Sequence, residues 1–459
     1  MTLRRGRQLG AGLTIGIRHR LAVTLAAAAL GFALAGSAPA TSGTGWLDNL
    51  LSHGSPADSS ADPAKPREGT LKADEALLDQ LAIAYPIFDH GAEQTMLGAI
   101  DFYQRIAEHG GWPAVPKSHT LRRDDQDESI QVLRRHLALT DGLDPKSVDD
   151  YTYDADVEAA VQRFQKRHGI PPSGIVDRRT LYALNVTAEA RLAQLRINLA
   201  RLRELLTKGV PPRFIMVNEP AFELQAVNNG RLELRSRVVV GRIERPSPTV
   251  AAAVKGVNFF PYWHVPDSVA VKDIIPHMQK DPSYIDREHI RALTDWTGDE
   301  IDPTGVDWFS PAAEQIKFRQ DPGLYNALGL VRIDMPNTES VYMHDTPKKE
   351  LFGRATRAFS AGCVRVQSVF DLVTWLLSAN GDWNRARVDS VLASGVPLDV
   401  TLQEPVPVYF VYLTAWAGPK GDVNFRPDIY DRDGGDGTII EAKDGGVSAE
   451  PMPQAGLAP

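Results

Sequence analysis

The hydrophobic periodicity of the chain changes at Pro211-Pro212, and this change constrains the fold more than any other feature. Before the two prolines, apolar residues recur every three or four positions, which is typical of amphipathic helices. After them, apolar and polar residues alternate as in half-buried strands, and the turn Asn228-Asn229-Gly230 joins two such runs. A helix cannot continue through consecutive prolines. The chain is therefore predicted to be multidomain α+β, with helical domains before residue 212 and a β-rich domain after it.

The helical part is predicted to contain a small scaffold over residues 71–122 and a compact three-helix module over residues 123–187. The scaffold has helical patterns at 73–84 and 92–108. In the module, apolar residues at helical spacing indicate two helices: Ile130, Leu133 and Leu137 in one, and Val157, Val161 and Phe164 in the other. These residues are expected to form one core.

Capping residues place the next helices. Asp177 can cap a third short helix of the module, and Thr187 can cap a connecting helix over 188–211. The β-rich domain is predicted to cover 212–405. A charged insertion at 267–328 interrupts it, and we expect this insertion to be helical, to pack no core and to act as a lid.

Both ends of the chain differ in composition from the rest. Residues 1–40 carry arginines, an apolar run and Ala38-Pro39-Ala40, the pattern of a secretory signal cleaved after Ala40, which predicts a periplasmic protein. A signal that is not cleaved would instead be an inner-membrane anchor. Residues 41–70 are predicted to be a flexible linker, and 406–459 a C-terminal extension whose end is disordered.

The overall composition excludes some classes of function. The chain has 459 residues, of which 43% are hydrophobic and 24% charged, near the averages for globular proteins. Its net charge of -8 gives no basic surface for phosphates, so no nucleic-acid partner is expected. His264, His277 and His289 lack the spacing of metal ligands, and there is no cysteine pair. No metal and no cofactor are predicted.

The chain contains one cysteine, Cys363, which cannot form an intramolecular disulfide. It is therefore inert and buried, part of an intermolecular bridge, or reactive. Thiolate attack on a carbonyl requires a lowered thiol pKa or a nearby base, and backbone N–H donors for the oxyanion. A strand ending at His344 would supply an imidazole, and a turn at Gly362 would point the amides of Gly362 and Cys363 at one site. Arg365 either adds positive potential to this site or pairs with a carboxylate in the fold.

Fifteen residues separate His344 from Ser360, which opens Ser360-Ala361-Gly362-Cys363-Val364-Arg365. This pattern resembles the signature of YkuD-type L,D-transpeptidases. Further segments are similar to the YcbB-like branch of that family, and the likeness spans residues 72–415: Gly241-Arg242, Arg245-Pro246-Ser247-Pro248, Asn258, Pro261-Tyr262-Trp263 and 335–366. The string from Tyr153 to Asn185 resembles the peptidoglycan-binding domain of cell-wall enzymes.

The resemblance implies that Cys363 is the nucleophile, His344 its base, and the amides of Gly362 and Cys363 the oxyanion hole. It implies site-shaping or substrate-binding roles for a further set of residues: Ser360, Arg365, Asp345, Tyr342, Tyr262, Trp263 and Asn258. Many relatives have glycine where this chain has Asp345, so either the Asp345 side chain or a backbone carbonyl orients His344. Many also have histidine where this chain has Ala361.

The implied reaction uses peptidoglycan tetrapeptide stems as donor and acceptor. Cys363 displaces the terminal D-Ala from the third residue of one stem, and the resulting thioester passes to the side-chain amine of the third residue of another. The resemblance also implies that carbapenems acylate Cys363. Other acceptors remain open: a lysine of an outer-membrane protein, a free D-amino acid or water. A different class, a catalytically silent wall-binding scaffold, also remains open.

Overall fold

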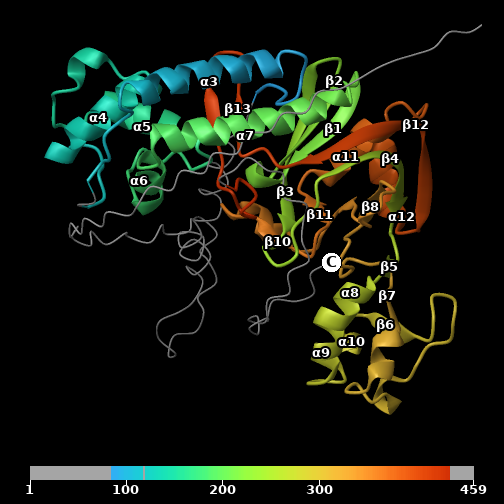
Figure 1. Cartoon of the computed structure of the whole chain (residues 1–459). Coiled ribbons are helices and arrows are strands. Elements are labelled where there is room, and N and C mark those ends of the chain that lie inside the picture. The colour runs from blue at the N-terminus through green and yellow to red at the C-terminus, as the bar shows by residue number, and fades with distance from the viewer. Residues whose placement is uncertain (1–83, 117–118, 435–459) are drawn as a thin grey trace, which may run out of the picture. The chain divides into compact units, whose positions relative to one another are not determined.

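The structure is a computed structural model that describes residues 84–116 and 119–434 (Figure 1). The predicted signal, the linker, the helix at 73–84 and the end of the C-terminal extension lie outside these residues. Within the two described ranges, no helix is both long and apolar enough to cross a membrane.

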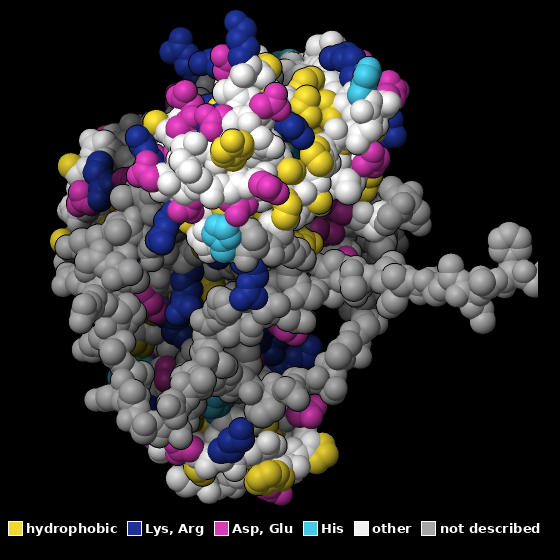
Figure 2. Space-filling view, turned by 90° about the vertical axis from the view of Figure 1, so that its left-hand side faces the viewer, with side chains coloured by type: hydrophobic (Ala, Val, Ile, Leu, Met, Phe, Trp, Pro, Cys, Tyr) yellow, Lys and Arg dark blue, Asp and Glu magenta, His cyan; other side chains and the backbone are white. Residues whose placement is uncertain are grey.

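The first half is helical, as predicted. Its helices are α3 Ala92–Glu108, α4 Glu128–Thr140, α5 Ala155–Arg167, α6 Arg178–Leu184 and α7 Ala188–Thr207. The expected caps are present, because Asp177 accepts the N–H of Thr180 and Thr187 accepts the N–H of Ala190. Helices α4 to α6 enclose a core that includes all six apolar residues expected there. Figure 2 views the chain from the side of α4 and α5, and shows acidic, basic and hydrophobic side chains interspersed on the described surface.

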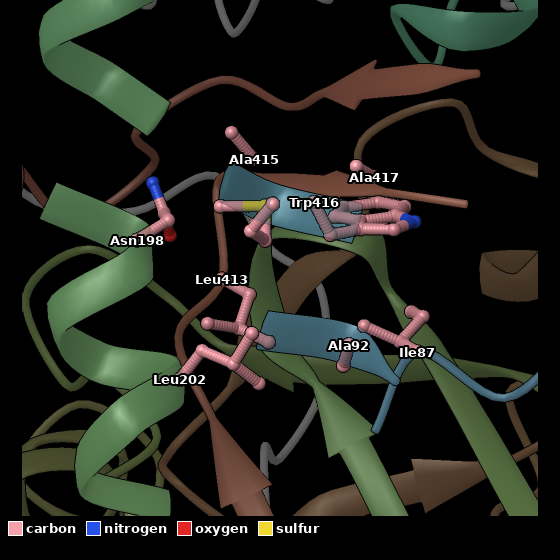
Figure 3. A pocket seen from close by; sticks show the side chains of 9 residues that line it. Ile87, Ala92, Asn198, Leu202, Leu413, Ala415, Trp416 and Ala417 are labelled. Atoms are coloured by element: carbon pink, nitrogen blue, oxygen red, sulfur yellow. The ribbon is translucent and has the colours of Figure 1, made fainter. Parts of the chain in front are cut away.

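Helices α3 and α7 lie side by side (Figure 1) and share a core with the start of the β-rich domain. The leucine face of α7 is buried there, as the sequence pattern predicts. Two short strands near the end of the described chain, β13 Ala415–Ala417 and β14 Val423–Phe425, complete this core. Figure 3 shows a small pocket at the seam between these elements, lined by apolar side chains and by Asn198. The C-terminal extension thus packs against the helical half.

A nine-stranded sheet forms the centre of the second half. Its strands are β1 Arg213–Asn218, β2 Glu223–Asn228, β3 Arg231–Gly241, β4 Val250–Phe259, β8 Val331–Asp334, β9 Met343–His344, β10 Ala358–Ser360, β11 Val364–Val366 and β12 Leu398–Val411. Their order is β10-β3-β11-β9-β8-β4-β12-β1-β2, and β2 also pairs with β3. The first part of β3 bonds to β2 and the second part to β11 and β10, so the strands close into a ring. The predicted turn joins β2 to β3, with positive φ at Asn229 and Gly230.

The sheet extends beyond the predicted end of its domain. Residue 405 lies inside β12, which runs on to Val411 and pairs with β1 and β4. Pro405 and Pro407 break the strand pattern in the sequence, and the structure accommodates them with a shift of register between Thr401 and Val406. Helices α11 Val369–Leu377 and α12 Arg385–Ser394 precede this strand.

The insertion at 267–328 differs from the expectation. Besides short helices it contains a three-stranded sheet of order β5-β7-β6, which includes Trp263 and His264 just before the insertion. Its elements are β5 Trp263–His264, α8 Asp267–Val269, a π-helical turn at Ala270–Ile274, α9 Ile275–Met278, α10 Tyr284–Arg287, β6 Ile290–Leu293 and β7 Lys317–Gln320. The expectation that it packs no core was wrong, because these elements bury their own cluster around Trp263 and Phe318. Strands of four residues are too short to show their periodicity in the sequence.

Candidate active site

Strand register places His344 at the centre of the site. β9 runs parallel to β11, with His344 opposite Arg365, and antiparallel to β8, with His344 opposite Arg332. Directly paired residues on neighbouring strands project from the same face of a sheet. The imidazole therefore lies between two arginine positions, and both His344 and Arg365 are buried.

Cys363 lies in the turn between β10 and β11, at residues 360–364. The Ser360 hydroxyl accepts the Gly362 N–H at 3.1 Å and donates to the Cys363 carbonyl at 2.5 Å. Gly362 has φ of +129°, a conformation that side chains rarely allow. Ser360 and Gly362 therefore fix the backbone on which Cys363 is held.

The two N–H groups predicted to form the oxyanion hole differ in their bonding. The Gly362 N–H donates to the Ser360 hydroxyl in this structure. Among the described residues, the Cys363 N–H has no hydrogen-bond partner. The sequence does not reveal this difference, because it does not show which backbone groups the Ser360 hydroxyl bonds to.

A backbone carbonyl orients His344. Its Nδ1 bonds to the carbonyl oxygen of Asp345, while the Asp345 carboxylate accepts the N–H of Leu330 at 3.0 Å and pairs with Lys349. This bond settles the proton on Nδ1 and leaves Nε2 as the basic nitrogen. Nε2 is buried, and no group in the described ranges bonds to it. Of the two alternatives left by the sequence, the carbonyl is therefore the one present.

Both reactive groups are neutral in the free protein. Burial, reinforced by Arg365, lowers the pKa of His344 to about 3. Burial raises the pKa of Cys363 to about 11, although interactions with the Tyr342 backbone and side chain and the charges of Arg365 and Arg332 oppose that rise. A thiol with a lowered pKa, one of the two conditions weighed from the sequence, is thus not what this environment gives. The other condition, a base that acts on the thiol, requires a basic nitrogen, and Nε2 of His344 is such a nitrogen.

The remaining predicted residues differ in what they contact. The Tyr342 ring meets the His344 ring edge to face, with centroids 5.7 Å apart. The Asn258 side-chain oxygen accepts a hydrogen bond from Nε of Arg332 at 2.9 Å. Since Arg332 lies opposite His344, this contact links Asn258 to the site. Trp263 is buried in the core of the insertion, and the half-exposed Tyr262 stacks beneath Arg319 at 5.0 Å.

Two residues of the site were missed by the sequence reasoning. Arg332 alternates with buried residues in β8 and carries no motif, so only the register reveals that it neighbours His344. Ser247 lies in a segment that resembles the YcbB-like branch, and the sequence pattern gives it no role in the site. Its hydroxyl donates to the Gly362 carbonyl at 2.7 Å. In the part of the chain that the structure describes, no group of three or more His, Cys, Asp or Glu side chains could hold a metal ion.

Comparison with known proteins matches two parts of the chain to protein families. Residues 212–406 match the "L,D-transpeptidase catalytic domain" family, YkuD, and residues 126–184 match the family described as "Putative peptidoglycan binding domain". A curated relative from Haemophilus influenzae, named "Putative L,D-transpeptidase", is 37% identical over 250 residues. That alignment covers 53% of this chain and 49% of the relative, so the chain matches about half the length of the relative.

Solved structures of L,D-transpeptidases are also similar to the chain, but only distantly. One from Stackebrandtia nassauensis is 14% identical, covering 63% of this chain and 97% of that one, with a TM-score of 0.24. L,D-transpeptidase 3 from Mycobacterium tuberculosis is 10% identical, covering 44% and 61%, with a TM-score of 0.22. On the family matches, residues 212–406 form an L,D-transpeptidase catalytic domain of the YkuD family, and a peptidoglycan-binding domain precedes it in the same chain.

Proposed function

We propose that the chain cross-links peptidoglycan by joining the third residues of two stem peptides through a thioester on Cys363. The observation that carries this proposal is the pairing of two features: a cysteine on a turn whose own N–H is unpartnered, and a histidine whose Nδ1 is anchored so that Nε2 is basic. Cys363 is then the nucleophile and His344 the general base.

In the first half-reaction, the sulfur attacks the carbonyl of the third residue of the donor stem, and its proton passes to Nε2 of His344. The oxyanion accepts the Cys363 N–H. The C–N bond to D-Ala then breaks, Nε2 returns the proton to the leaving amine, and a thioester remains. In the second half, the side-chain amine of an acceptor stem attacks the thioester carbonyl, and His344 takes a proton from it. A new amide bond forms, the C–S bond breaks, and the leaving sulfur regains the proton from Nε2, which restores the free thiol.

The pKa values indicate when the proton moves. A thiol whose pKa is raised to about 11 and an imidazole whose pKa is lowered to about 3 both favour their neutral forms at pH 7. The transfer of the proton from sulfur to Nε2 is therefore proposed to accompany attack on the bound donor. Arg365, which is buried and has an Nε without a partner in the described ranges, stabilises the negative charge that develops beside it.

The insertion is proposed to close over the donor stem and exclude water from the thioester. Its core contacts Tyr342 and Ala361, each two residues before His344 or Cys363. Asp273 of the insertion also pairs with Arg245 at 2.5 Å and with Arg242 at 3.3 Å, both in the loop after β3. These contacts couple the insertion directly to the segments that carry the reactive groups.

The other domains fit a cell-wall enzyme of the periplasm. We propose that the three-helix module holds the chain on peptidoglycan and that the N-terminal segment exports it. The acceptor is proposed to be a second stem, with water and other amines as competitors.

The test is incubation of the protein with purified disaccharide-tetrapeptide, followed by mass analysis of the products. Wild type should release D-Ala and form a dimer linked through third residues, whereas Cys363→Ala should do neither while keeping its thermal unfolding. Wild type should also gain the mass of one carbapenem, and the variant should not. Tripeptide without dimer would make the protein a carboxypeptidase, and absence of D-Ala release would overturn the proposal.

A further inference from the structure

The peptide bond between Gly362 and Cys363 carries the Cys363 N–H, which has no hydrogen-bond partner among the described residues. In a trans peptide the C=O and the N–H lie in one plane and point in opposite directions. The Gly362 carbonyl of this peptide accepts the Ser247 hydroxyl at 2.7 Å. Whatever holds that carbonyl therefore also sets the direction of the Cys363 N–H.

Ser247 is built into its place. It is fully buried, and its hydroxyl also accepts the N–H of Gly241 at 2.9 Å, so both of its hydrogen-bonding roles are used. Pro246 and Pro248 on either side restrict its backbone. The loop folds back so tightly on Gly241 that a Cβ there would overlap the backbone of Arg245 and Ser247.

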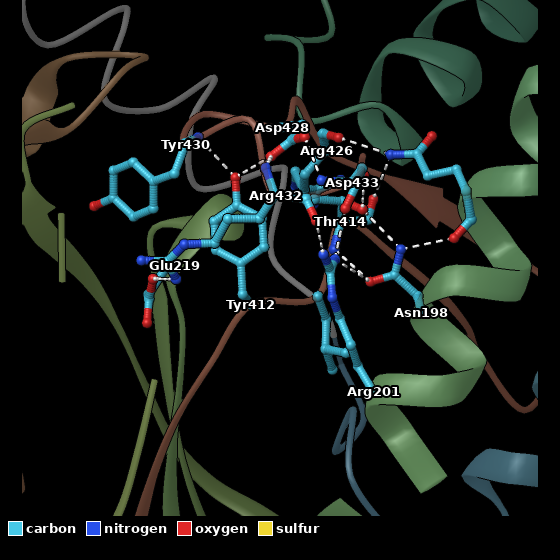
Figure 4. A network of polar contacts seen from close by, with 12 residues as sticks. Asn198, Arg201, Glu219, Tyr412, Thr414, Arg426, Asp428, Tyr430, Arg432 and Asp433 are labelled. Atoms are coloured by element: carbon cyan, nitrogen blue, oxygen red, sulfur yellow. Dashed lines mark hydrogen bonds and ion pairs between the residues drawn. The ribbon is translucent and has the colours of Figure 1, made fainter. Parts of the chain in front are cut away.

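A segment near the end of the described chain contacts this loop through Tyr430 and Arg432, which Figure 4 shows close to Tyr412 and Glu219. The Arg432 guanidinium contacts the stacked rings of Tyr412 and Tyr430, 4.8 Å from each centroid. It donates to the Ser247 carbonyl at 3.0 Å and to the Glu219 carboxylate at 3.3 Å. The Tyr430 hydroxyl donates to the Gly241 carbonyl at 2.6 Å. The contacts thus run from Arg432 through Ser247 to the Gly362 carbonyl.

We propose that Ser247 is a positioning residue that aims the Cys363 N–H at the oxyanion, and that Tyr430 and Arg432 hold Ser247 in place. This inference rests on Cys363 being the nucleophile of the proposed function. It concerns the donor to the oxyanion, not the reactivity of the sulfur.

The test compares two reactions of the same thiol. Acylation by p-nitrophenyl acetate passes through an oxyanion, whereas alkylation by iodoacetamide does not. Rates at Cys363 are measured by mass, with Cys363→Ala as the background. Ser247→Ala should slow acylation by about tenfold to a hundredfold, because a misdirected donor loses part of the stabilisation that such N–H groups give. Alkylation should change less than twofold, and Ser247→Thr, which keeps the hydroxyl, should recover most of the acylation rate.

Two further variants complete the design. Ser236→Ala is the matched control, since this buried serine bonds to the Ser368 N–H and the Arg237 carbonyl instead of the nucleophile turn, and it should leave the ratio of the two rates unchanged. Arg432→Gln should lower the ratio in the same direction as Ser247→Ala, and it carries the test if Ser247→Ala does not fold.

An unchanged ratio in the folded variants, or an equal loss of both rates, would overturn the inference. If wild type acylates with the expected ratio but releases no D-Ala from tetrapeptide, the proposed function fails while this inference stands.

Discussion

At the scale of single residues, the neutrality of Cys363 leads to a prediction about pH. With a thiol pKa of about 11, the thiolate fraction rises tenfold for each pH unit below that value, so alkylation by iodoacetamide should be slow at pH 7 and rise about tenfold per unit to pH 10. His344 stays neutral throughout, since its pKa is about 3. Mass spectrometry of timed samples gives the rates. The urea-unfolded chain is the control, because its thiol should have a pKa of about 8.5. A plateau near pH 8 in the folded protein would contradict the prediction.

A second residue-scale prediction concerns Gly329, which has φ of +61° and faces the Asp345 carboxylate so closely that a Cβ would overlap it. Since the carbonyl of Asp345 anchors His344, Gly329→Ala should destabilise the fold by more than about 2 kcal/mol and reduce acylation at least about tenfold. Gly395 has a similar φ of +67° but open space around it, so Gly395→Ala should cost only about 1 kcal/mol and leave acylation unchanged. Urea unfolding and acylation rates check both. Equal effects of the two substitutions would show that backbone strain alone is responsible.

Single residues could be predicted from the sequence where a local pattern carries the chemistry. Cys363, His344 and Ser360 stand in one such pattern, and the structure places Ser360 at the end of β10, Cys363 just before β11, and His344 in β9 opposite Arg365 of β11. Arg332 could not be found, because its place beside His344 depends on the register between β8 and β9. Likewise, the bond between the Gly362 N–H and the Ser360 hydroxyl could not be found, because it depends on a side chain that turns back on its own backbone.

At the scale of elements, the contacts of Asp273 predict how the insertion controls the fate of the thioester. Asp273→Asn weakens the pairing with Arg242 and Arg245, which are only slightly exposed. A loss of about 1–2 kcal/mol should raise the share of hydrolysed product several-fold to about tenfold, because water reaches the thioester more often. The ratio of hydrolysed to cross-linked product at a fixed amine concentration measures this share. Asp281→Asn, whose partner Arg287 lies in the same insertion and is exposed, should leave the ratio unchanged. If both variants behave like wild type, the insertion does not act as a lid through this contact.

Elements were predictable in proportion to their length. Long helices with a capping residue, such as α5 and α7, show several turns of periodicity in the sequence and were placed within a few residues. Strands of two to four residues, such as β6, contain too few positions for alternation to appear. Their pairing in the insertion is a tertiary result, which explains why that segment was expected to be helical.

At the scale of the whole molecule, two histidines link the three-helix module to the rest of the described chain. Their rings belong to a closed circle of contacts: Trp112, His136, Phe164, His168, Phe425 and Tyr103. Burial lowers the pKa of His136 to about 3 and that of His168 well below its usual value. The neighbouring charges of Arg167 and Arg191 act in the same direction, while Asp141 pairs with Arg167.

This arrangement predicts a loss of stability in acid. Both histidines are neutral in the folded chain and gain a proton at about pH 6.5 in the unfolded chain. Their contribution to the free energy of unfolding is therefore complete above that pH and falls as the pH drops below it. Below that pH, each histidine should lower the free energy of unfolding by about 1.4 kcal/mol per pH unit. Urea unfolding at pH 7, 6 and 5 would measure this loss. His136→Phe should lower this slope by one proton. A slope identical to that of wild type would mean that His136 already binds its proton in the folded state.

The ring of strands also bears on how the chain reaches its folded state. β12 fills the gap between β4 and β1, yet it follows them in the sequence by well over a hundred residues. Until β12 has been synthesised, β4 and β1 each expose an unpaired edge that can accept a strand from another chain. Such distant pairing also slows folding. The interval before the last strand arrives is therefore when this protein is most exposed to aggregation, and when a chaperone that covers strand edges would help it most.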